Sequence, residues 1–331
     1  MAVREDSPGF QFLMSKRIPP ELILETIQHV PFEDGARIKC LRRLIPRVQQ
    51  VISQYEYSLT RWFMKKELRH AAVDFPYGDD MFSLRWLSEC VSRYDIVDAI
   101  MRELTWCQNC VAVASHNVAV VYAGLLLLYR LASLDGHAPK HALLKTLSRS
   151  SSTALYLALQ HATLTARYHG HGWIHQRSTY GYGGRFMDDA HHHQQLSLRN
   201  ELEFCFAEAS LCLGPVFLYD MLVTPEEGQG EISLLNVYHE HASHDWDGPC
   251  WEGGAARVEP PRTQGPQKED KGTSLFTALL ERMAEVEKCS LAEVRRRVDE
   301  TRGARDHDLA FLTLDAKARV IAGEDVVSGL E

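Results

Sequence analysis

The sequence predicts a mainly α-helical protein: a small N-terminal three-helix module followed by a larger α-helical domain. From Ile18 onward, apolar residues recur at steps of three and four, which is the spacing of one helix face. Alternating runs of β-branched residues, the usual sign of strands, are few. The chain has 331 residues and is 45% hydrophobic and 24% charged, a balance typical of a globular protein with a substantial core.

The first predicted helix occupies the stretch "IPPELILETIQHVP", residues 18–31. Pro20 is tolerated at the first helical position because its missing N–H would have no partner there. Ile23, Ile27 and Val30 then fall on one face, and Pro31 ends the helix.

Two more helices complete the N-terminal module, which is expected to span residues 18–70. The second opens at Glu33 and Asp34, and its apolar positions are Ile38, Leu41, Leu44 and Ile45. Pro46 either kinks this helix or starts the third, because proline is not accommodated in a helix interior. The third carries a broad apolar stripe made of Val48, Val51, Ile52, Tyr55, Leu59, Trp62 and Phe63. Residues 1–17 are expected to form a flexible arm, and 72–80 a turn-rich connector.

The larger domain is predicted over residues 80–223, from four longer helical patterns at about 82–106, 110–134, 138–168 and 194–223. Glycines, prolines and polar residues then dominate 224–273, which predicts a linker or a disordered loop. A C-terminal helical segment is expected over 274–331. It contains one helix from about 274 to 288 and another at Ser290, where Glu293 completes a capping box.

Charge and hydropathy limit the functional classes. The formal net charge is −8, with both signs mixed along most of the chain, so neither a nucleic-acid footprint nor a polybasic membrane patch is predicted. The most apolar window, residues 110–132, is split by polar residues and closed by Arg130, which favours a buried helix over a membrane span. The N-terminus lacks an uninterrupted apolar run for secretion, so a cytoplasmic or nuclear location is expected.

Candidate catalytic and metal-binding residues are few, and no catalytic residue or cofactor is predicted. Histidines and aspartates gather between 169 and 193, and imidazole and carboxylate suit zinc or iron. Their spacing matches no motif that places ligands on one face, so His169, His171, His191 and His193 are weak metal candidates. Cys107 and Cys110 form a single Cys-x-x-Cys pair, which is interpreted as two helix-buried thiols. The eight cysteines predict reduced thiols.

The opening segment resembles the F-box, in the degenerate form found in filamentous fungal proteins. Ile18, Pro19, Glu21 and Leu22 follow the order hydrophobe-Pro-x-Glu-Leu, and "HVPFED" at 29–34 is similar to the turn that follows in the family. Gly35 and Ala36 stand where the family usually has leucines.

The resemblance implies a small helical unit that docks onto the Skp-type linker of a cullin–RING ubiquitin ligase. The implied contact residues are Ile18, Pro19, Leu22, Ile27 and Val30. The implied function is an adaptor that recruits an unknown client protein, with catalysis in its partners. Two alternatives stay open: a helical scaffold with no ligase role, and a metal-dependent enzyme that uses the region 169–193.

Overall fold

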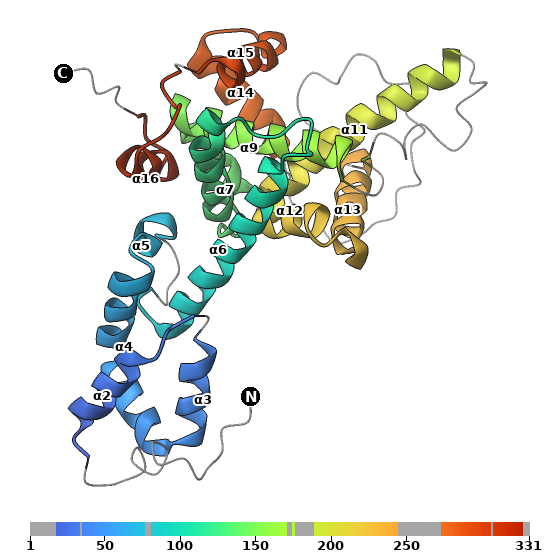
Figure 1. The fold of residues 1–331 in the computed structure, drawn as a ribbon. Coiled ribbons are helices and arrows are strands. Elements are labelled where there is room, and N and C mark those ends of the chain that lie inside the picture. Colours follow the sequence, from blue (N-terminus) through green and yellow to red (C-terminus); the bar gives the residue numbers. More distant parts are fainter. Residues whose placement is uncertain are drawn as a thin grey trace, which may run out of the picture. The chain divides into compact units, whose positions relative to one another are not determined.

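The computed structural model describes residues 18–33, 35–76, 81–170, 174–175, 189–243, 273–305 and 307–326, with 189–199 and 242–243 as backbone alone. These residues form α-helices and two short 3-10 helices, with no strand among them, which confirms the mainly α prediction (Figure 1). The expected flexible arm at 1–17 lies outside the described residues.

The chain divides into two compact units, residues 1–95 and 96–331. The boundary falls inside helix α6 (Leu84–Thr105), later than the connector at 72–80 where the sequence suggested it. α6 begins within the first unit because that unit caps it: the Glu56 carboxylate accepts the N–H of Leu84 at 3.1 Å, and the Ser83 hydroxyl accepts that of Trp86 at 3.0 Å.

The first unit contains α2 (Pro20–His29), α3 (Ala36–Leu44), α4 (Pro46–Glu67) and the one-turn α5 (Ala71–Asp74). Proline stands in the first turn of both α2 and α4, so Pro46 starts a third helix rather than kinking the second. The break in α4 comes later, at Tyr55, whose φ of −117° and ψ of 19° are not helical.

The turn between α2 and α3 is fastened to the end of α4. Phe32 is fully buried, and its ring centroid lies 5.1 Å from that of Phe63. The Phe32 N–H donates to the Glu67 carboxylate at 3.1 Å. Gly35 follows with a φ of 76°, and a Cβ there would meet the Ser88 hydroxyl oxygen at 2.6 Å, so glycine is required at this position.

The second unit is built around α7 (Val118–Ala132) and α9 (Arg149–Tyr168), which pack along each other. Gly124 permits their close approach, because a Cβ at this position would lie 2.8 Å from the Ala158 Cβ. The stretch Ser115–Ala132 is long and apolar enough to cross a membrane, but 67% of it is buried among other helices, as expected for a core helix.

Four more helices pack within this unit: α8 (His137–Thr146), α11 (Asp189–Leu213), α12 (Pro215–Leu222) and α13 (Gln229–Ser243). The prediction of a loop throughout 224–273 is wrong for α13, which contacts α11 and α12. The sequence pattern did not indicate the short apolar face of α13, because most residues of this segment are polar; Leu234, on that face, is 1% exposed. The remainder, 244–272, lies outside the described residues.

The C-terminal helices, in the region predicted as a helical segment over 274–331, pack within the second unit. α14 (Leu275–Glu287) packs on α8 and α9, and α16 (Leu314–Ala322) packs on α7. α15 (Leu291–Gly303) begins with the predicted capping box of Ser290 and Glu293. The buried carboxylate of Glu208, from α11, caps α14 by accepting the N–H groups of Leu275 and Phe276 at 3.0 and 2.8 Å.

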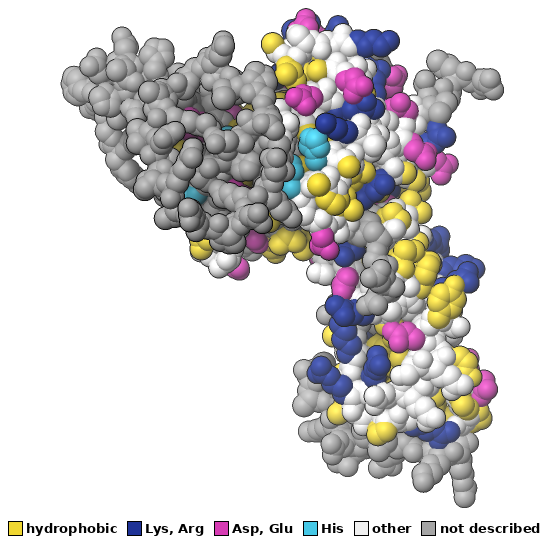
Figure 2. Space-filling view, turned by 180° about the vertical axis from the view of Figure 1, so that it is seen from behind, with side chains coloured by type: hydrophobic (Ala, Val, Ile, Leu, Met, Phe, Trp, Pro, Cys, Tyr) yellow, Lys and Arg dark blue, Asp and Glu magenta, His cyan; other side chains and the backbone are white. Residues whose placement is uncertain are grey.

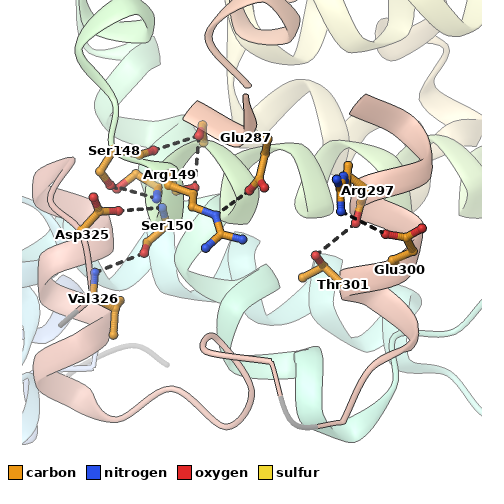
Figure 3. A network of polar contacts seen from close by, with 11 residues as sticks. Ser148, Arg149, Ser150, Glu287, Arg297, Glu300, Thr301, Asp325 and Val326 are labelled. Atoms are coloured by element: carbon orange, nitrogen blue, oxygen red, sulfur yellow. Dashed lines mark hydrogen bonds and ion pairs between the residues drawn. The ribbon is translucent and has the colours of Figure 1, made fainter. Parts of the chain in front are cut away.

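The chain beyond α16 is bonded to the first turn of α9 (Figure 3). The Ser148 N–H donates to the Gly323 carbonyl at 3.0 Å, and the Val326 N–H donates to the Ser150 hydroxyl at 3.1 Å. Arg149, in the same turn, forms an ion pair of 2.6 Å with Glu287 of α14. This part of the network therefore joins α9, α14 and the residues after α16.

Candidate functional site

The five residues implied as linker contacts divide into a buried and an exposed set. Ile18 and Ile27 are 7% and 1% exposed, respectively, and belong to the core of the first unit. Pro19 and Leu22 are exposed, Leu22 at 45%, and Val30 is half-buried. Pro19, Leu22 and Val30 are hereafter called the α2 surface, because a partner can reach them without unfolding the unit.

Local sequence explains why α2 presents Leu22 to solvent. Ile23 and Ile27 are buried one turn apart, so they fix the inward face of the helix, and Leu22 points away from it. The guanidinium of Arg47 donates to the Ile18 carbonyl, which holds the entry to α2 against the start of α4. The α2 surface is therefore presented by an anchored helix.

Other apolar side chains of the first unit also reach the surface. Leu44, Tyr57 and Val73 are 41%, 57% and 44% exposed. Tyr57 lies under the guanidinium of Arg61, 5.7 Å from the ring centroid, and its ring centroid lies 5.8 Å from that of Phe82. Tyr57 falls outside the apolar stripe predicted for this helix, so the periodic pattern gave no signal for it.

The structure does not bring the predicted metal candidates together in the described part of the chain. His171 lies outside the described residues, and His191 and His193 lie on α11 where its backbone alone is described. His169, at the end of α9, accepts the Cys110 N–H at its Nε2, 2.8 Å away. No set of three or more His, Cys, Asp or Glu side chains among the described residues could hold a metal ion.

The Cys-x-x-Cys pair lies in turns and not in a helix, so the interpretation as helix-buried thiols is wrong. Cys107 and Cys110 are both exposed, and the Cys110 Sγ lies 3.4 Å from the His169 Nε2. Asn109 is the physical reason for the turns. Its side chain donates to the Thr165 hydroxyl at 2.9 Å and accepts the Val111 N–H at 3.0 Å, which stabilises turns in place of further helix.

One further histidine of α9 is unusual. His161 is 3% exposed, and neither ring nitrogen makes a hydrogen bond of normal geometry. Burial, reinforced by the positive charge of Arg302, lowers its pKa to about 4, against a smaller opposing effect of the Val111 backbone. His161 is therefore neutral in the folded protein near neutral pH.

Charges of both signs are interspersed on the face of the molecule seen in Figure 2, with apolar side chains among them.

Comparison of the chain with protein-family models, with curated proteins and with solved structures finds no match. The fold and the site define a mainly α-helical protein with an exposed α2 surface.

Proposed function

We propose that the chain is an interaction protein of the cytoplasm or nucleus whose first unit docks onto the Skp-type linker of a cullin–RING ubiquitin ligase. The observation that carries the proposal is the exposure of Leu22 beside Pro19, on a helix whose opposite face is buried. The resemblance of this segment to the F-box supplies the identity of the partner. The client protein would bind elsewhere on the chain, and catalysis would belong to the partner proteins.

The α2 surface has the physical character of a small docking site. A few apolar anchors provide most of the affinity in such interfaces. Burial of a leucine side chain contributes about 1.5–3 kcal/mol, and Pro19 adds apolar area with little loss of conformational freedom. Polar residues surround these anchors on α2, including Thr26, whose hydroxyl is bonded to the Leu22 carbonyl at 2.7 Å.

The burial pattern decides which variant tests the proposal. Ile27→Asp would place a charge in the core and unfold the unit, so it cannot separate docking from stability. Leu22→Asp changes an exposed side chain and leaves the core intact. Ile232→Asp, on α13 of the second unit, is a matched control because Ile232 is 53% exposed.

The experiment measures binding of the purified linker to the full chain by calorimetry or pull-down. Wild type and Ile232→Asp are expected to bind equally, and Leu22→Asp is expected to lose at least about tenfold in affinity, equivalent to about 1.4 kcal/mol. Equal binding by all three proteins would show that α2 is not the docking element. A folded chain that ignores the linker would instead be a helical scaffold with no ligase role.

A further inference from the structure

The first unit contains a second surface feature, of a different chemical kind from the α2 surface. A hollow of about 460 Å³ lies at the corner between α3 and α4, lined by Lys39, Arg42, Arg43 and Gln49. It is a shallow hollow that is widely open to solvent, and not an enclosed pocket. We propose that this basic hollow binds the phosphate group of a phosphorylated protein side chain.

The charge around the hollow is unbalanced. Residues 35–55 contain five basic residues and no acidic one, in a chain whose net charge is −8. Two of the five are engaged elsewhere: Arg37 pairs with Glu33 at 2.9 Å, and Arg47 donates to the Ile18 carbonyl.

The other three basic residues, Lys39, Arg42 and Arg43, line the hollow and form no ion pair with any residue that the structure describes. The dipole of α3 accounts for part of this arrangement, because Arg42 and Arg43 lie in its last turn, where cations are favoured. It does not account for Lys39, which lies nearer the middle of the helix. Three neighbouring cations repel one another, and a multiply charged anion between them would relieve that repulsion.

The donor set suits a phosphate ester. Guanidinium groups present paired N–H donors that match phosphate oxygens, and clusters of arginines recognise phosphorylated residues for this reason. The Lys39 ammonium adds a third cation and the Gln49 amide an uncharged donor. A phosphoserine carries a charge of about −1.5 to −2 near neutral pH, which would offset most of the local excess.

The shape and the lining favour a phosphorylated side chain over other anions. None of the described residues that line the hollow is aromatic, so these residues offer a nucleotide base no ring to stack on. The three cations of the hollow all lie on the single short helix α3, which is shorter than the path of a nucleic-acid backbone across a binding surface. Lys39, Arg43 and Gln49 are exposed, so the hollow is open enough to admit a side chain that projects from an extended peptide.

The proposal does not depend on linker docking, because the hollow is formed by α3 and α4 and the docking residues lie on and beside α2. The test uses fluorescence anisotropy of the full chain with two labelled probes: a glycine-rich peptide with one central phosphoserine, and the same peptide with serine. The phosphorylated probe is expected to bind at least about tenfold more tightly. Its affinity should fall as salt is raised, as for other charge contacts at the surface.

Two double variants identify the site. Arg42→Ala with Arg43→Ala is expected to reduce binding of the phosphorylated probe at least tenfold, and Arg61→Ala with Arg69→Ala is expected to leave it within twofold. Both remove two charges from exposed or half-buried positions of the same unit, so a difference between them reports position and not net charge. Circular dichroism and thermal melting confirm that both remain folded.

Three outcomes would overturn the proposal. Equal binding of the two probes would show that phosphate is not recognised, and equal losses in both double variants would show non-specific attraction. Binding of inorganic phosphate or an inositol phosphate without the phosphopeptide would assign the hollow to a free anion. Linker binding separates the two proposals, because the Arg42 and Arg43 double variant should retain it and Leu22→Asp should retain phosphopeptide binding.

Discussion

The carboxylate of Asp325 accepts the backbone N–H of Ser150 at 3.0 Å, across 175 positions of sequence (Figure 3). Ser150 lies at the second position of α9, where the N–H has no partner within the helix. The preceding Ser148 caps the next N–H, that of Ser151, at 3.2 Å. The first turn of α9 is therefore completed by a residue close to the C-terminus.

Removal of this cap should destabilise the second unit. Asp325→Ala is expected to lower the free energy of unfolding by about 1 kcal/mol, because the Ser150 N–H loses its acceptor. Urea denaturation followed by circular dichroism measures the change. Asp98→Ala, which removes an exposed carboxylate from α6, is the control and should stay within about 0.5 kcal/mol of wild type. Equal effects in the two variants would contradict the capping role.

The buried imidazole of His161 should make stability depend on pH. Its folded pKa of about 4 lies below the ordinary value of 6.5, so the unfolded chain binds more protons between these two values. The free energy of unfolding should therefore fall as pH is lowered from about 6.5 to about 4, by up to about 3 kcal/mol. In His161→Leu that part of the dependence should disappear, and denaturation series at pH 7, 5.5 and 4.5 measure it. If the free energy of unfolding depends on pH equally in the variant and in wild type, groups other than His161 cause the dependence. His141, whose pKa is also lowered by burial, contributes in the same direction.

The contact between α7 and α9 should tolerate no added methyl group. Gly124→Ala would press a Cβ against the backbone of Ala154 and the side chain of Ala158, and we expect a loss of about 2 kcal/mol from overpacking. Thermal melting measures the change. Gly303→Ala is the matched control, since its backbone is helical and, apart from its chain neighbours and its own helix backbone, no atom of the described residues lies within 4 Å of the position of the new methyl group. A similar loss in both variants would show that packing between α7 and α9 is not the cause, since helix propensity favours alanine over glycine at both positions.

The buried carboxylate of Glu208 should be needed for the start of α14. It accepts two backbone N–H groups, and hydrogen bonds to a charged acceptor are each worth about 1.5–3 kcal/mol. Glu208→Gln replaces one acceptor oxygen by a donor, so we expect a loss of about 2 kcal/mol in chemical denaturation. Glu226→Gln changes an exposed carboxylate and should have little effect. Comparable stability of the two variants would rule out the cap.

Local signals predicted where several helices begin, although the single helical pattern expected at 138–168 is two helices, α8 and α9. Pro20 and Pro46 stand in the first turns of α2 and α4, and the Ser290 capping box begins α15, because each of these signals acts on its own helix end. Predictions failed where distant contacts decide the structure. Helix α13 forms in a segment of mostly polar composition and buries the side chain of Leu234 against other helices. The hydrogen bond from the Asn109 side chain to Thr165 holds Cys107 and Cys110 in turns.

The candidate surfaces were partly predictable. The pattern of α2 indicated which side chains are apolar, but the resemblance alone could not separate the buried Ile18 and Ile27 from the exposed Leu22. That separation depends on how α2 packs on α4. The net charge did not predict the basic hollow, because Lys39, Arg42 and Arg43 belong to a short basic run within a chain that is acidic as a whole.

Gly35 limits how this unit can be redesigned. Its left-handed backbone and the nearby Ser88 leave no room for the leucine that the F-box resemblance would place there. Replacing Gly35 by the leucine of the family pattern would therefore produce a steric clash in the turn between α2 and α3. Transplanting residues 18–95 as an intact cassette would keep Gly35 together with the neighbours that require it.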